Sequence, residues 1–188
     1  MPVPRPWHTE SSETILDLQP WLSIIKDTVK LPSGRVVDDY YRIEAPDYVL
    51  ISAQRDDGAI LMERHYKQCL GRIILTSPAG GVDEGETPLE AARRELVEET
   101  GFEAEEWKAL GSFVVDGTRG ICTAHLFSAK KLKYVVAPKV DDMEQFDLQF
   151  LNVMEIRAAV SDGLITLLPD VALLSMTFDN LLLTTPGL

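Results

Sequence analysis

Residues 80–102 read GGVDEGETPLEAARRELVEETGF and carry local signals for both ends of a helix. Thr87 can cap a helix, Pro88 suits its first position, and Glu90 can reach back to the cap, so that the three form a capping box. Gly101 can adopt the left-handed conformation that ends a helix. The stretch therefore predicts a helix from Pro88 to the residue before Gly101.

One side of this predicted helix is apolar, and the adjoining flank is acidic. The apolar stripe consists of Leu89, Ala92 and Leu96. The flank carries Glu95, Glu98 and Glu99, which lie within about 100° of one another around the helix axis. Like charges at such spacings destabilise a helix, so three gathered carboxylates need a compensating cation.

Two kinds of cation can compensate these carboxylates. Arg94 is one, since it can pair with Glu90 and Glu98 across one helical turn. A hard divalent metal is the other, because magnesium prefers carboxylate oxygens, water and substrate phosphates. The alternative is an acidic helix face that water alone solvates. We favour the metal because a whole spaced pattern is present rather than a single acidic pair.

The same stretch resembles the Nudix box, G-x5-E-x7-R-E-U-x-E-E-x-G-U, where U is an aliphatic or aromatic residue. Gly80, Glu86, Arg94 and the run that ends at Phe102 fill every fixed position. The resemblance implies an enzyme that hydrolyses a nucleoside diphosphate linked to another group and that uses a divalent metal. It also implies an α/β fold, the Nudix α/β/α sandwich with a mixed sheet, preceded here by an N-terminal antiparallel β hairpin.

The resemblance assigns roles residue by residue, with Mg²⁺ as the expected metal and Mn²⁺ as the alternative. The metal ligands that it assigns are the carbonyl of Ala79 and the carboxylates of Glu95, Glu98 and Glu99. The catalytic residues that it assigns within the box are Arg94, Glu98 and Glu99. Glu86 is expected to brace the loop, while Gly80 and Gly81 would let backbone approach the metal and the substrate phosphates.

Length and composition limit the number of domains, the cellular compartment and the classes of partner that the chain can have. The 188 residues suffice for one domain with an extension, and we divide them into an arm and hairpin at 1–45 and a catalytic domain at 46–188. Neither a membrane span nor a secretory leader is evident. Cys69 and Cys122 lack metal-binding spacing and suit reduced thiols, so we expect a cytoplasmic protein. The net charge of −12 argues against nucleic-acid or membrane partners.

Alternation and turn residues predict the remaining elements. The N-terminal hairpin joins residues 21–31 and 35–44 around Pro32-Ser33-Gly34. The core strands are predicted at 47–54, 59–64, 72–76, 107–115, 121–129 and 145–151. Two C-terminal helices are predicted at 154–161 and 169–183.

Three features resemble the branch of the family that hydrolyses ADP-ribose and other nucleoside diphosphate sugars. They are the N-terminal hairpin, the segment ILMERHYKQCLGRIILTSPAGG and the strand AHLFSAKKL after the box. In that branch the N-terminal sheet crosses to a second subunit, which implies a homodimer. The branch commonly has Gln-Tyr-Arg where this chain has His65-Tyr66-Lys67, and a glutamate near the position of Thr76. These departures favour a broader or different range of diphospho-sugars.

Candidate substrate-binding side chains also lie outside the box. Tyr40 and Tyr66 could stack on a base, and the alternative is packing within strands. Lys67, Arg72 and Arg119 could contact phosphate, and the alternative is a solvated surface. The nucleotide sugar is thus the expected small-molecule partner.

A carboxylate must orient or deprotonate the attacking water. In the branch it comes from a loop between the last strands, which here reads KVDDMEQFDLQF. Asp142 and Glu144 are the candidates, with solvated loop acids as the alternative. We prefer Glu144 because the predicted strand that follows it could hold it in place.

The predicted function is metal-dependent hydrolysis of a nucleoside diphosphate sugar to a nucleoside monophosphate and a sugar phosphate. One alternative is a Nudix hydrolase that acts on another nucleoside diphosphate derivative or on a nucleoside triphosphate. Another is a Nudix-fold binding module without catalysis. Such modules usually lack box glutamates, and this chain has the full set.

Overall fold

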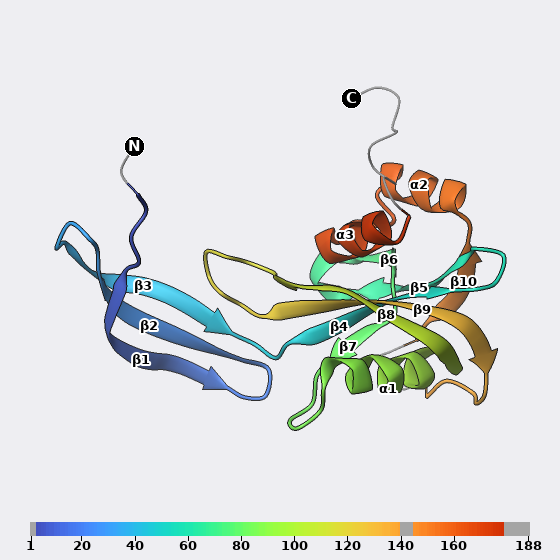
Figure 1. The fold of residues 1–188 in the computed structure, drawn as a ribbon, viewed down its shortest axis with the longest axis horizontal. Helices are drawn as coiled ribbons and strands as arrows, with labels where there is room; N and C mark the ends of the chain where they lie inside the picture. The colour runs from blue at the N-terminus through green and yellow to red at the C-terminus, as the bar shows by residue number, and fades with distance from the viewer. Residues whose placement is uncertain (1–2, 140–144, 179–188) are drawn as a thin grey trace. The chain divides into compact units, whose positions relative to one another are not determined.

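The computed structural model describes residues 3–139 and 145–178, which form two compact units. One unit comprises the described residues up to 47 together with residues 114–123. The other comprises residues 48–113 and the described residues from 124 onward. Figure 1 shows the elements of both.

The first unit is built on an antiparallel sheet of three strands in the order β1-β2-β3. The strands are β1 (His8–Leu18), β2 (Leu22–Lys30) and β3 (Val36–Glu44). The predicted hairpin is confirmed as β2 and β3. Strand β1 was not predicted, because its sequence HTESSETILDL is largely polar and each of its residues is exposed, so no apolar alternation marks it.

A buried carboxylate ties the three strands of this sheet together. Asp27, on β2, is only 3% exposed. Its carboxylate accepts hydrogen bonds from Arg42 Nε on β3 at 2.5 Å and from Ser12 Oγ on β1 at 2.6 Å. Burial alone would raise the pKa of Asp27, but the hydrogen bonds from Arg42 and Ser12 lower it below its usual value.

The second unit contains a mixed sheet of seven strands with the central order β10-β5-β4-β9-β8. Strand β6 pairs with β5, β7 pairs with β4, and β4 and β9 run parallel. The strands are β4 (Tyr48–Gln54), β5 (Ile60–Lys67), β6 (Arg72–Thr76), β7 (Ala79–Gly81), β8 (Phe102–Val114), β9 (Thr123–Tyr134) and β10 (Asp147–Leu151). A short 3-10 turn, Gln68–Leu70, follows β5.

Helices cover both faces of this sheet, as Figure 1 shows. The helices are α1 (Pro88–Thr100), α2 (Val153–Ser161) and α3 (Leu168–Thr177). Alternate residues of β4 point to opposite faces, so that Ile51 packs in the core under α1 with Leu96, while Leu50 packs with Leu173 of α3. The predicted α/β/α sandwich is confirmed. Among the described residues, none of the helices is long and apolar enough to cross a membrane.

Helix α1 has the predicted bounds because its ends are specified locally. Thr87 Oγ1 accepts from the backbone N–H of Glu90 at 3.3 Å, and Glu90 Oε2 accepts from the backbone N–H of Thr87 at 2.8 Å. Gly101 ends the helix with a φ of 75°, in the left-handed region. Because Glu90 serves the cap, Arg94 pairs with Glu86 in its place, whereas the predicted pair of Arg94 with Glu98 is confirmed.

The remaining boundaries differ from the predictions in several places. Strand β8 begins at Phe102 rather than at residue 107, and β9 extends to Tyr134 rather than to residue 129. Strand β7 is absent from the predicted strands, because Pro78, Gly80 and Gly81 are turn formers. Strand β5 runs to Lys67 rather than to residue 64, which places His65 and Tyr66 on the strand itself. The last helix was predicted at 169–183; its described part ends at Thr177, and residues 179–183 lie outside the described range.

Candidate active site

Arg94 is the centre of the box. Its guanidinium meets Glu86 through two hydrogen bonds, Nε to Oε1 at 3.0 Å and Nη2 to Oε2 at 2.8 Å. It also donates to Glu95 Oε1 at 2.6 Å, to Glu98 Oε2 at 3.5 Å and to the carbonyl of Gly81 at 2.9 Å. Arg94 therefore fixes the loop between β7 and α1 and orients two of the three helix carboxylates.

The pKa values of this cluster follow from those contacts. The hydrogen bond with Glu86, ahead of that with Glu95, raises the pKa of Arg94 above its usual value. The same bond from Arg94 lowers the pKa of Glu86. Glu86 also accepts from the backbone N–H of Asp83 at 3.2 Å. The prediction that Glu86 braces the loop is confirmed.

Gly80 provides a cradle for the carboxylate of Glu95. A Cβ atom at position 80 would lie 2.0 Å from Cδ of Glu95, so the Glu95 carboxylate would have to move away. A residue without a side chain is therefore needed for Glu95 to lie against the loop backbone. The box thus brings the carboxylate of Glu95 into direct contact with the backbone of β7.

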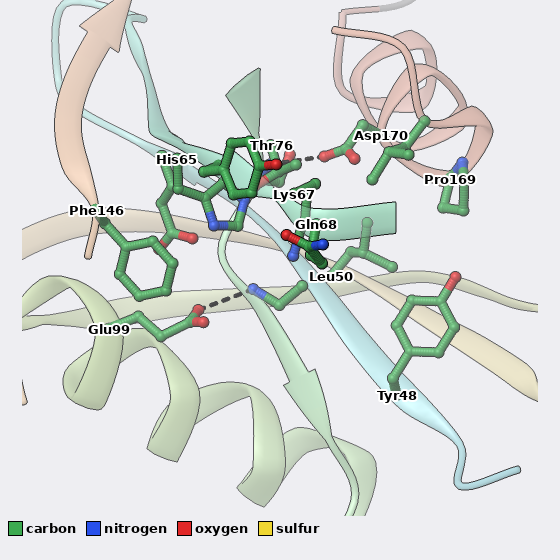
Figure 2. A pocket seen from close by; sticks show the side chains of 15 residues that line it. Tyr48, Leu50, His65, Lys67, Gln68, Thr76, Glu99, Phe146, Pro169 and Asp170 are labelled. Atoms are coloured by element: carbon green, nitrogen blue, oxygen red, sulfur yellow. Dashed lines mark hydrogen bonds between the residues drawn. The ribbon is translucent and has the colours of Figure 1, made fainter. Parts of the chain in front are cut away.

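Glu99 joins α1 to the start of β7. Its side chain is buried, at 9% exposure, and its Oε2 accepts from the backbone N–H of Ala79 at 2.9 Å, the lower dashed line in Figure 2. The structure therefore brings together two of the residues predicted to bind metal.

Glu98 has a partner that the sequence did not reveal. Lys139 Nζ contacts the Glu98 carboxylate, and the backbone N–H of Lys139 donates to the Glu98 carbonyl at 2.8 Å. The hydrogen bond from Lys139 lowers the pKa of Glu98. Lys139 directly precedes residues 140–144, so Asp142 and Glu144, the predicted bases, lie outside the described residues.

The box fits a hard divalent cation in the kind of ligand that it offers. Carboxylates of Glu95, Glu98 and Glu99 and the Ala79 carbonyl are oxygen donors, and the Gly80 cradle brings backbone close to one of them. Within residues 3–139 and 145–178, His, Cys, Asp and Glu side chains do not meet in groups of three or more as a ready metal cage. Arg94 and Lys139 instead balance Glu95 and Glu98.

A pocket of about 530 Å³ opens beside Glu99 and Ala79. Its other lining residues come from β4, β5, β6, the neighbouring turns and the start of α3 (Figure 2): Tyr48, Leu50, Glu63, His65, Tyr66, Lys67, Gln68, Thr76, Ser77, Phe146, Leu167, Pro169 and Asp170. The structure thus places Tyr66 and Lys67, two predicted substrate-binding residues, in one pocket with Glu99. Arg72 is not part of this lining, and Tyr40 and Arg119 belong to the other unit.

His65 occupies this pocket as a neutral ring. Its Nε2 lies 3.0 Å from Oγ1 of Thr76, and its ring lies 5.1 Å from that of Phe146, centroid to centroid. Burial, and then the nearby charge of Lys67, lowers the pKa of His65 to about 4. His65 is therefore a polar contact without charge near neutral pH.

Asp170 is a buried carboxyl that sequence reasoning missed. It lies in the first turn of α3, is 2% exposed, and accepts from the backbone N–H of Ser77 at 2.6 Å. Burial raises the pKa of Asp170 to about 6. The available signal was an acidic residue right after Pro169 in the otherwise apolar run LLPDVALL.

Family models match nearly the whole described chain. The model of the NUDIX domain matches residues 45–170, and that of the nucleoside diphosphate sugar hydrolase N-terminal domain matches residues 7–43.

Similar proteins include an ADP-ribose pyrophosphatase of Bacillus subtilis (strain 168), 29% identical over 135 residues, which are 72% of this chain and 70% of that protein. The methanol dehydrogenase activator of Bacillus methanolicus is 35% identical over 130 residues, 69% of this chain and 70% of that protein. A crystal structure titled as that of an ADP compounds hydrolase superposes with a TM-score of 0.83 at 20% identity, covering 95% of this chain and 96% of that one. At that identity the superposition supports the fold alone.

Proposed function

Since this chain belongs to the NUDIX domain family, we propose that it is a metal-dependent pyrophosphohydrolase of nucleoside diphosphate sugars. The products are a nucleoside monophosphate and a sugar phosphate. The names of two similar proteins support this substrate class, the ADP-ribose pyrophosphatase of Bacillus subtilis and the ADP-sugar pyrophosphatase of Mus musculus, the latter 26% identical over 129 residues, 63% of this chain and 59% of that protein. The match of residues 7–43 to the N-terminal domain of nucleoside diphosphate sugar hydrolases supports it further.

The observation that carries the proposal is the position of Glu99. It joins the box helix to Ala79 and also lines the pocket. A metal-bound diphosphate beside Glu99 would lie next to side chains that suit a sugar or a nucleoside. Lys67 supplies positive charge for phosphate, and neutral His65 and Thr76 supply hydrogen-bonding groups for hydroxyls.

The box residues would hold the metal. Its ligands in this proposal are the Ala79 carbonyl, Glu95 and Glu99, with Glu98 as a further donor. When bound, a divalent ion neutralises charge that develops on the diphosphate and lowers the pKa of a coordinated water. We propose Mg²⁺ as the ion, with Mn²⁺ as the alternative, because the donors are all oxygens.

The chain's own residues position these donors and move the proton. Arg94 holds Glu95 and the β7–α1 loop in place. The water oxygen forms a bond to one phosphorus, the bridging P–O bond breaks, and the leaving phosphate carries away the bridging oxygen. The water proton passes to a carboxylate, for which we propose Glu144, with Asp142 as the alternative.

We also propose a cytoplasmic homodimer that binds neither nucleic acid nor membrane. Residues 1–45 would supply the dimer contact and part of the substrate site, and residues 46–188 the catalytic domain. The first unit exposes large apolar side chains, with Ile15 and Leu18 of β1 at 50% and Trp21, in the turn between β1 and β2, at 78%. The two cysteines are free, which suits a reducing compartment. The net charge of −12 disfavours binding to nucleic acid or to anionic membranes. Light scattering after gel filtration tests the dimer.

The experiment that tests the enzymatic proposal is a substrate panel. The protein is incubated with MgCl₂ or MnCl₂ and with ADP-ribose, ADP-glucose, GDP-mannose, UDP-glucose or nucleoside triphosphates. Monoesters released are counted as inorganic phosphate after phosphatase treatment. We expect turnover on at least one diphospho-sugar, and none when EDTA replaces the metal. Turnover on triphosphates alone would favour the alternative hydrolase, and no turnover at all would favour a binding module.

A further inference from the structure

Asp170 reaches from helix α3 to the loop that leads into the box. Its carboxylate accepts from the backbone N–H of Ser77 at 2.6 Å, and Ser77 lies two residues before Ala79. Figure 2 shows Asp170 and Glu99 on helices that cover opposite faces of the sheet. Both carboxylates therefore bind the same short loop, one from each side.

Three successive residues of this loop are each held by a different element. Ser77 donates its N–H to Asp170 of α3, and the carbonyl of Pro78 accepts from Ile51 N of β4 at 2.9 Å. Ala79 donates its N–H to Glu99 of α1 at 2.9 Å. The Pro78 carbonyl and the Ala79 N–H belong to one peptide plane, which Ile51 and Glu99 therefore hold from both ends, and Asp170 holds the peptide plane that carries the Ser77 N–H. The Ala79 carbonyl, a proposed metal ligand, follows directly after these held planes.

We propose that Asp170 is a positioning residue for the metal site, acting through the backbone of Ser77 on the Ala79 carbonyl and on Glu99. The inference rests on the proposed function in one respect, that the box binds a divalent metal. It does not require any particular substrate. Groups behind metal ligands commonly change metal affinity about 10- to 100-fold when they are removed.

The surroundings of Asp170 favour this role over a purely structural one. Asp170 is 2% exposed, and Leu173 and Leu174 of the same helix are fully buried. Burying a carboxyl in such surroundings is unfavourable, and a well-packed apolar side chain of similar volume is often at least as stable. What Asp170 supplies beyond packing is an acceptor at a fixed point, directed at the loop of the metal site.

Direct measurement of metal affinity tests this proposal. Mn²⁺ binding is measured without substrate, by electron paramagnetic resonance of free Mn²⁺, for wild type and for Asp170→Leu, Asp170→Ala and Asp170→Asn. Leucine keeps the branched shape without a polar atom, alanine removes the side chain beyond Cβ, and asparagine keeps a carbonyl acceptor. Ser175→Ala is the matched control, because Ser175 lies on the same helix and donates to Val171 O instead.

We expect Asp170→Leu to weaken Mn²⁺ binding about tenfold or more, and Asp170→Asn and Ser175→Ala to stay within about threefold of wild type. In activity assays, the half-saturating Mn²⁺ concentration for Asp170→Leu should rise by the same factor as the dissociation constant. The maximal rate at saturating Mn²⁺ should change far less. If Asp170→Ala folds, its Mn²⁺ affinity should match that of Asp170→Leu. If Asp170→Ala does not fold, the affinity of Asp170→Leu alone tests the proposal.

Unchanged Mn²⁺ affinity in a folded Asp170→Leu protein would overturn the proposal, as would an Asp170→Asn protein as weak as Asp170→Leu. Failure of wild type to bind Mn²⁺ would overturn it too. These outcomes are separate from the substrate panel, because a protein that binds Mn²⁺ in the expected way and cleaves no nucleotide sugar would contradict the proposed function alone.

Discussion

The carboxylate of Glu99 accepts the backbone N–H of Ala79 at 2.9 Å, which joins the end of the box helix to the first residue of β7. These two residues are twenty positions apart, and both are proposed metal ligands. Because Glu99 also lines the pocket, the same contact links the metal site to the space for substrate.

Gly80→Ala should lower activity by about tenfold or more, because the new Cβ would lie within 2.0 Å of Cδ of Glu95 and displace a metal ligand. The measurement is the steady-state rate at saturating metal and substrate. Gly117→Ala is the control, because a Cβ there meets nothing within 4 Å. Equal activity of Gly80→Ala and wild type would show that Glu95 need not lie against the loop.

Arg94→Lys should also lower activity by about tenfold or more, although the charge is kept. Lysine cannot reproduce the two hydrogen bonds to Glu86 together with those to Glu95 and Gly81. Arg93→Lys is the matched control on the neighbouring position. The two variants are compared by rate and by thermal melting, and similar rates for both would contradict the role of the guanidinium fork.

Stability should depend on pH through Asp170, whose pKa is raised to about 6 from an ordinary 3.8 by burial. The folded state then binds more protons than the unfolded state between these values, so Asp170 stabilises the fold at low pH. This contribution is lost as pH rises through about 6. Asp170→Asn cannot titrate, and its free energy of unfolding relative to wild type should rise by up to about 3 kcal/mol from pH 4 to pH 7.

Urea denaturation of both proteins across this range measures the difference, in which the titrations shared by the two proteins cancel. A difference that stays constant with pH would mean that the carboxyl of Asp170 titrates at its ordinary value in the folded protein.

Glu144→Gln should lower the maximal rate by about 100-fold or more, the range expected when a general base is lost. Asp142→Asn is the parallel variant. If Glu144→Gln stayed within about threefold of wild type while Asp142→Asn fell, the role would pass to Asp142. Single-turnover assays at saturating metal keep product release out of the comparison.

Local signals predicted one part of the molecule well. The bounds of α1 follow from Thr87, Pro88 and Gly101, whose effects act within a turn of the chain. The mixed sheet and the helices on both faces followed from the family resemblance. Strand β1 could not be predicted, because its residues are exposed on the sheet and carry no apolar pattern.

Contacts between segments that are far apart in the sequence could not be predicted. Lys139 reaches Glu98 across 41 positions, and Asp170 reaches Ser77 across 93. Neither residue belongs to a spaced motif, so no local pattern marks it. Tyr66 and Lys67 could be nominated from the resemblance, whereas their placement in one pocket with Glu99 depends on how β5 packs beside β4 and β6.

The role of the box carboxylates in metal-dependent cleavage of a diphospho-sugar is tested by Glu99→Gln, because glutamine keeps an oxygen acceptor for the N–H of Ala79 and loses only the charge. With MgCl₂ and the best substrate of the panel, we expect a rate about 100-fold or more below wild type and an unchanged melting temperature. A Glu99→Gln protein as active as wild type would show that the Glu99 carboxylate takes no part in catalysis.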